Sequence, residues 1–189
     1  MGCGRWLCSC FAFTDVELRD LTRGAHAAPA RRFTFWSVIV MKASSRLNSS
    51  LSMRRTTAPD SVLVHKATEM LQPGDALMID IGGDTRHAPV GEMVALAARE
   101  RGAVGIVLDG VCTDIVEIRA MGMPVFARGT SVLTTKLHGL QAGSINAPVS
   151  CGGVVVRPGD VVLGDDNGVL VLSAAVAQAV VERARASDE

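Results

Sequence analysis

From Pro59 onward, short apolar runs alternate with segments of helical periodicity, and this alternation restricts the possible folds more than any other feature of the chain. Helical spacing predicts helices over residues 61–71, 90–101, 115–121 and 174–186. Compact apolar runs predict strands over residues 76–81, 104–108, 124–127, 145–149, 153–156, 161–164 and 169–172. Helices between the first strands require crossovers, whereas the Pro-Gly-Asp and Asp-Asn-Gly turns that follow favour hairpins. The pattern predicts an α/β fold with mixed sheets and outer helices.

The first 58 residues differ, because their apolar residues follow no sustained period of two or 3.6. We interpret residues 1–58 as an atypical, partly disordered leader and linker, and residues 59–189 as one domain. Within the leader, residues 33–41 are either a short strand or an apolar targeting segment, and nine residues are too few to span a bilayer, which needs about twenty. The serine-rich residues 42–52 are typical of a linker.

Composition narrows the classes of function. Nineteen basic and nineteen acidic residues give no net charge and aromatic residues make up 4% of the chain, so we expect neither direct nucleic-acid binding nor a membrane partner. The five cysteines have no regular spacing, which favours a reduced, cytoplasmic location over a disulfide framework. Cys8-Ser9-Cys10 lacks the two-residue spacer of a zinc knuckle, and we interpret Cys112 and Cys151 as core residues. The histidines lie apart, without metal-ligand spacing.

Asp114 is the first candidate for chemistry, because it follows an apolar strand and a glycine-containing turn. Ligands of open α/β sheets usually bind at this end of a strand. Glu92, Asp109 and Glu117 are acidic residues that could join it, and carboxylate oxygens suit Mg²⁺ or Mn²⁺. The alternative is that Asp114 caps the helix that begins at Ile115, as aspartate commonly does. The pattern alone leaves both interpretations open.

Four segments together resemble a known family: PGDALMIDIGGDT (73–85), GEMVALAARERGAVGIVLDG (91–110), TDIVEIRAMGMPVFARG (113–129) and NAPVSCGGVVVRPGDVVLGDDNGVLV (146–171). Their order is similar to that of the ribonuclease activity regulator A and 4-hydroxy-4-methyl-2-oxoglutarate aldolase family. The resemblance extends from about Pro59 to the C-terminus. It implies a compact β/β/α swivelling-type domain that assembles as a homotrimer or as a dimer of trimers.

The family signature is an acidic residue, twenty residues, then Arg-Asp, two residues and another acid. Glu92 takes the first place, Asp114 the aspartate and Glu117 the last, while Thr113 stands where the family has arginine. The resemblance implies that Asp114 is the metal ligand and that Glu92 helps through bound water. It also implies that the substrate carboxylate is received by the backbone at the start of a helix, at Gly91, Glu92, Met93 and Val94. Glu92, Thr113 and Asp114 are then the predicted catalytic residues, and Thr113 also belongs to the substrate-binding set.

The activity implied by the resemblance is a Mg²⁺- or Mn²⁺-dependent lyase that cleaves a pyruvate-containing aldol or decarboxylates oxaloacetate through a metal-stabilised enolate. Thr113 predicts impaired activity, because a hydroxyl lacks the charge and planar fork of a guanidinium. Rescue would require Arg86, Arg119 or Arg128 to reach the site. The alternative hypothesis is a non-catalytic regulator that binds a ribonuclease E-type protein, which has no need of the arginine.

Overall fold

The structure is a computed structural model that describes residues 39–42, 50–53, 60–139, 143–165 and 167–187. Its larger sheet consists of β2 (Ser50–Met53), β3 (Ala76–Asp84), β4 (Gly105–Cys112), β5 (Val125–Thr130) and β6 (Gly143–Ile145). The strand order is β5-β4-β3-β2-β6. The first four strands in this order are parallel, whereas β6 pairs antiparallel with β2 at the edge. β4 therefore lies inside the sheet, and its carboxyl end is a natural place for a site.

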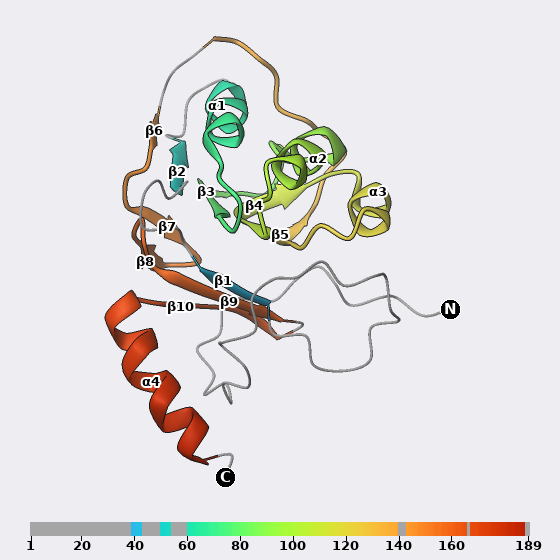
Figure 1. Ribbon diagram of the computed structural model, residues 1–189. Helices are drawn as coiled ribbons and strands as arrows, with labels where there is room; N and C mark the ends of the chain where they lie inside the picture. Colours follow the sequence, from blue (N-terminus) through green and yellow to red (C-terminus); the bar gives the residue numbers. More distant parts are fainter. Residues whose placement is uncertain (1–38, 43–49, 54–59, 140–142, 166, 188–189) are drawn as a thin grey trace.

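Three helices connect the parallel strands and lie on one side of the larger sheet (Figure 1): α1 (Val62–Met70), α2 (Glu92–Glu100) and α3 (Ile115–Ala120). The other side faces β1 (Ile39–Lys42), β7 (Val149–Cys151), β8 (Val154–Val156), β9 (Val161–Asp165) and β10 (Gly168–Leu172). Of these, β1, β9 and β10 form an antiparallel sheet, and β7 and β8 form a hairpin. Helix α4 (Ala174–Ser187) follows at the end opposite α1 to α3. Along the described residues no helix is both long and apolar enough to cross a membrane.

Side-chain alternation along β3 and β4 explains how one sheet supports two cores. Leu77, Ile79 and Ile106 belong to the core beneath the helices. Met78 and Val107, one residue out of phase, belong to the core against β7, β8 and β9. Because successive side chains of a strand point to opposite faces, both faces of these strands are apolar and buried. This is why the two segments read as continuous apolar runs.

The mixed α/β architecture predicted from the sequence is confirmed, and several boundaries are corrected. The strand predicted over 145–149 is wrong: it is two strands, β6 and β7, because Asn146 has a left-handed φ of 57° that interrupts extended backbone. The strand predicted to end at Ile81 continues to Asp84. β2 (Ser50–Met53) begins within residues 42–52, which were predicted as a linker, and β1 (Ile39–Lys42) begins within the apolar stretch 33–41. Cys8-Ser9-Cys10 lies outside the described residues.

Candidate functional site

The end of β4 brings the start of α2 beside the start of α3. Val90 forms a parallel bridge with Cys112, and the Thr113 N–H donates to the Val90 carbonyl oxygen at 2.9 Å. The two residues that follow Val90 therefore lie next to Thr113 and Asp114. In this way the fold joins two parts of the predicted signature that are more than twenty residues apart in sequence.

The Asp114 carboxylate is the centre of the site. Its Oδ2 accepts a hydrogen bond from the backbone N–H of Glu92 at 2.9 Å, and its Oδ1 accepts one from the Thr113 hydroxyl at 3.0 Å. Asp114 has a left-handed backbone, with φ 54° and ψ 40°, which few residue types other than glycine, asparagine and aspartate adopt readily. The geometry places an exposed carboxylate at the N-terminus of α2.

This arrangement corrects the interpretation of Asp114 as a cap of the following helix. Asp114 occupies the N-cap position of α3, but its side chain makes no capping hydrogen bond to α3. It supplies an acceptor to α2 instead, whose own N-cap residue, Gly91, has no side chain to offer. The acceptor therefore comes from a residue distant in sequence, whereas the local capping rule considers only the N-cap residue itself.

Gly91 is required by the approach of the carboxylate. A Cβ atom at this position would lie 2.5 Å from Asp114 Oδ2 and 2.8 Å from Thr113 Cγ2. Its φ of −137° is ordinary extended backbone, so the requirement is steric and does not depend on the conformational freedom of glycine. Gly91, Thr113 and Asp114 thus fit against one another as a unit.

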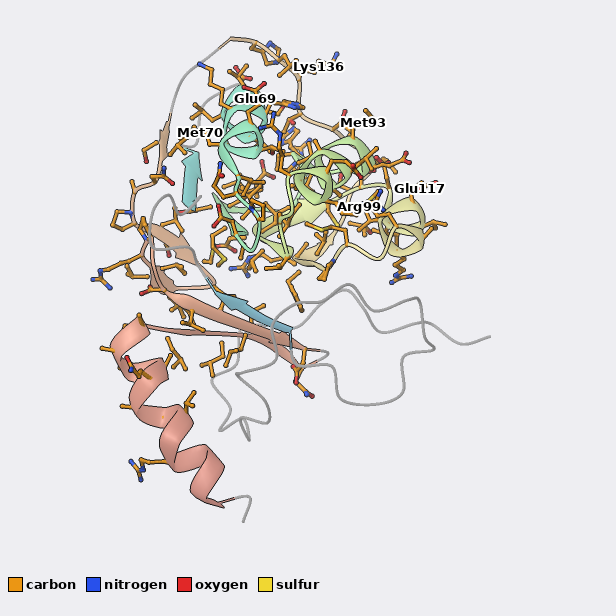
Figure 2. The ribbon with its side chains drawn as sticks, in the orientation of Figure 1. Glu69, Met70, Met93, Arg99, Glu117 and Lys136 are labelled. Atoms are coloured by element: carbon orange, nitrogen blue, oxygen red, sulfur yellow. The ribbon has the colours of Figure 1, made fainter. Side chains whose placement is uncertain are left out.

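The remaining acidic residues of the signature lie on the exposed first turns of two helices. Glu92 begins α2 and Glu117 lies in the first turn of α3. Figure 2 shows Met93 on α2 and Glu117 on α3, in the helical part of the molecule. Among the residues that the structure describes, no three His, Cys, Asp or Glu side chains gather as a set that could hold a metal ion.

The prediction that Asp109 joins Asp114 in one carboxylate cluster is wrong. The buried carboxylate of Asp109 binds the Arg128 guanidinium through Oδ1 and accepts the Gly152 N–H through Oδ2 at 3.1 Å. Its register partner on β3, Asp80, accepts the Ser150 N–H at 3.0 Å. These bonds attach the β7–β8 hairpin to the larger sheet, and they hold Arg128 at Asp109. Of the arginines considered for rescue, Arg86 and Arg119 are exposed.

Both described cysteines belong to the core. Burial raises the pKa of the Cys112 thiol to about 11 and that of the Cys151 thiol to about 12. The charges of nearby carboxylates act in the same direction as burial, Asp114 on Cys112 and Asp109 and Asp80 on Cys151. Thiols with such pKa values are protonated at neutral pH and are poor nucleophiles, which supports a structural role.

A hydrogen-bonded pair that was not predicted from the sequence, Asp84 and His87, lies at the end of β3. His87 Nδ1 lies 2.9 Å from Asp84 Oδ2, and the backbone N–H groups of Arg86 and His87 donate to Asp84 Oδ1. Burial alone would raise the pKa of Asp84, but the hydrogen bonds from His87 and the backbone outweigh it and lower the pKa. The Asp-x-x-His spacing was the available signal, although such spacing alone is weak.

Most of the chain matches a known protein family. The family model named RraA-like, Aldolase/RraA, matches residues 37–171. The chain belongs to the RraA-like family. The match also includes residues 37–58, which were predicted to be part of the leader and linker.

Individual RraA-like proteins agree with this assignment. One from Halalkalibacterium halodurans, whose name proposes a 4-hydroxy-4-methyl-2-oxoglutarate aldolase, is 40% identical over 126 residues. This alignment covers 67% of the present chain and 59% of the relative, so the chain spans little more than half of that protein. The structure of the RNA-processing inhibitor RraA from Thermus thermophilis matches with a TM-score of 0.57 and 28% identity, over 71% of this chain and 80% of that one.

A further solved structure supports the fold alone. It is Streptomyces coelicolor RraAS2, described as an unusual member of the RNase ES inhibitor RraA protein family. It has a TM-score of 0.63 at 24% identity and covers 80% of this chain and 73% of that chain. The fold predicted from sequence, with mixed sheets and outer helices, is the one these neighbours share.

Proposed function

We propose that this protein is a divalent-metal-dependent lyase, similar to 4-hydroxy-4-methyl-2-oxoglutarate aldolase, that also decarboxylates oxaloacetate and releases pyruvate. The observation that carries the proposal is the meeting of the Asp114 carboxylate with the N-terminus of α2, where Glu92 N lies 2.9 Å from Asp114 Oδ2. One group can bind a cation and the other an anion. A 2-oxo acid held by a metal needs both at one place, and the names of several relatives point to the same chemistry.

Asp114 would hold Mg²⁺ or Mn²⁺. The donor set fits Mg²⁺, since this ion keeps several waters and is commonly bound through only one or two carboxylates. Glu92, exposed at the start of α2, would orient a bound water. When bound, the metal would act as a Lewis acid toward the 2-oxo group of the substrate.

The N-terminus of α2 would bind the substrate carboxylate. The first backbone N–H groups of a helix have no acceptor within it, and the helix dipole adds partial positive charge there. An anion at such an end is therefore favourable. The N–H groups in question belong to Gly91, Glu92, Met93 and Val94. Met93 is 71% exposed, so a small acid reaches this turn from solvent.

Thr113 would make the enzyme slow. Its hydroxyl donates to Asp114 Oδ1, so the side chain positions the carboxylate and adds no positive charge to the site. The loss of one donor that stabilises an oxyanion typically costs about 10²–10³ in rate. We therefore expect weak oxaloacetate decarboxylation, with the family aldol as the second substrate to test.

The deciding experiment is a coupled assay of pyruvate release with Mg²⁺ or Mn²⁺. Thr113→Arg should raise turnover by restoring the guanidinium. Thr113→Val is the matched control, because it keeps a branched side chain of the same size, loses the hydroxyl and adds no charge. Absence of turnover with both substrates in the native protein and in Thr113→Arg would end the lyase proposal.

A second candidate function is regulation of a ribonuclease E-type protein by direct contact. It is supported by Thr113 and by the name of the Thermus structure, which describes an inhibitor of RNA processing. The chain also exposes apolar side chains on α2, α3 and the segment after β5: Met93, Val116, Val132, Leu133 and Leu137. Pull-down with a ribonuclease E scaffold tests it, and no association at micromolar concentration would count against it.

Native mass spectrometry would test the homotrimer or dimer of trimers that we propose from the family.

A further inference from the structure

Asp114 and a substrate carboxylate would compete for the same backbone N–H group. The Glu92 N–H already donates to Asp114 Oδ2. This N–H is also one of the helix-start donors to which the proposed function assigns the carboxylate of a 2-oxo acid. The site therefore contains an internal carboxylate where an external one is expected to bind.

Three features hold the internal carboxylate in place. The Thr113 hydroxyl binds its other oxygen, and Gly91 offers a surface without a side chain against which Oδ2 packs. The left-handed backbone of Asp114 turns its side chain away from α3, with which it makes no capping bond. Each oxygen of the carboxylate is thus bonded within the site.

We propose that Asp114 is a removable cap. Its carboxylate accepts the Glu92 N–H in the structure, and this bond must break before a substrate carboxylate can take that N–H. The side chain then becomes available as a ligand for a cation, so cation binding and anion binding favour each other through one side-chain movement. This inference rests on the proposed function for the identity of the anion, and it adds an autoinhibitory contact to that site.

Two substitutions of Asp114 separate the effect of an oxygen acceptor at the N-terminus of α2 from the effect of the negative charge. Asp114→Gly and Asp114→Asn both remove the negative charge, and both residue types tolerate the left-handed backbone. Asparagine keeps an oxygen acceptor for the Glu92 N–H, whereas glycine leaves the helix end open. The two variants therefore compare a helix end that has this acceptor with one that lacks it, at the same side-chain charge.

The experiment is a titration with sodium pyruvate in EDTA, followed through the amide resonances of Gly91 and Glu92 in ¹⁵N-labelled protein. Asp114→Gly should bind pyruvate about threefold to thirtyfold more tightly than Asp114→Asn, because removing a capping acceptor shifts equilibria by about that factor. The native protein should bind most weakly. Sodium chloride at equal concentration controls for ionic strength.

Equal affinity of the two variants would overturn the proposal, and so would the absence of any shift of the Glu92 amide in Asp114→Gly. Failure of the lyase function is seen separately, in the pyruvate-release assay with metal. Turnover combined with equal pyruvate affinities would support the lyase function and overturn the removable cap. Tighter binding by Asp114→Gly without turnover in the native protein or in Thr113→Arg would support the removable cap and overturn the lyase function.

Discussion

Gly91→Ala tests the geometry of the site most directly. The added Cβ would lie 2.5 Å from Asp114 Oδ2 and 2.8 Å from Thr113 Cγ2, both closer than side-chain carbons approach such atoms. The carboxylate must therefore shift. Because Glu92 N lies 2.9 Å from the same oxygen, the shift breaks that hydrogen bond.

The expected loss follows from the bond that is broken. A hydrogen bond to a charged group contributes about 1.5–3 kcal/mol, and water can replace part of it because Asp114 is exposed, so we expect the free energy of unfolding to fall by roughly 1–2 kcal/mol. For a chain of this size each kcal/mol lowers Tm by about 2–4 °C, which predicts a decrease of about 2–8 °C. Urea unfolding followed by circular dichroism, together with a thermal melt, measures both quantities.

Gly129→Ala is the matched control. There the nearest atom to an added Cβ is Val111 Cγ1 at 3.8 Å, an ordinary contact, so the change should stay within about 0.5 kcal/mol. Combining Gly91→Ala with Asp114→Gly completes a double-mutant cycle. If the carboxylate is the obstacle, the two losses should be non-additive by about 1 kcal/mol, and additivity within about 0.3–0.5 kcal/mol would refute the reasoning.

Three further predictions concern the rest of the fold. Gly164→Ala should lower the free energy of unfolding, measured by urea unfolding, by about 1–3 kcal/mol, because the added Cβ would lie 2.6 Å from the Phe126 ring. Combining it with Phe126→Leu should recover part of this loss, and no recovery would contradict the proposed clash with the ring. Cys151 in the native protein should resist iodoacetamide at about pH 8, because burial raises its pKa to about 12; an adduct seen by mass spectrometry would contradict this. The lowered pKa of Asp84 stabilises the fold above its unfolded value of 3.8, and the contribution is lost as pH falls through the lower folded value; His87→Ala should reduce this acid-dependent loss in unfolding measured across that range, and an unchanged pH profile would count against the pair.

The sequence predicted the elements whose pattern is set locally. The segments that form β3 and β4 are apolar on both faces, since each face has its own core, and continuous apolar runs are easily recognised. β2 was missed because its place between β3 and β6 depends on pairing with distant segments. Asn146 divided a predicted strand because a positive φ is a property of the folded turn, which an apolar run does not reveal.

The candidate site, like the fold, could be predicted from the sequence only in part. The spacing of the signature singled out Glu92, Thr113 and Asp114, and the structure brings these residues together at the end of β4. The alternative from the local capping rule, in which the Asp114 side chain caps α3, is wrong. Its true partner, the N-terminus of α2, is brought close by the bridge between Val90 and Cys112, a contact that spans α2 and β4 in the sequence.

Thr113 is more than an absence of arginine, and this changes how its substitution should be interpreted. A β-branched side chain has few χ1 choices. The Thr113 Oγ1 donates to Asp114 Oδ1, while its Cγ2 lies 2.8 Å from the place that a Cβ of residue 91 would take. Arginine would supply a guanidinium and would also remove that hydroxyl, so it would both add charge and release one of the two bonds on the Asp114 carboxylate. A gain of activity in Thr113→Arg that Thr113→Val does not share therefore comes from the guanidinium, whereas a shared gain comes from freeing Asp114.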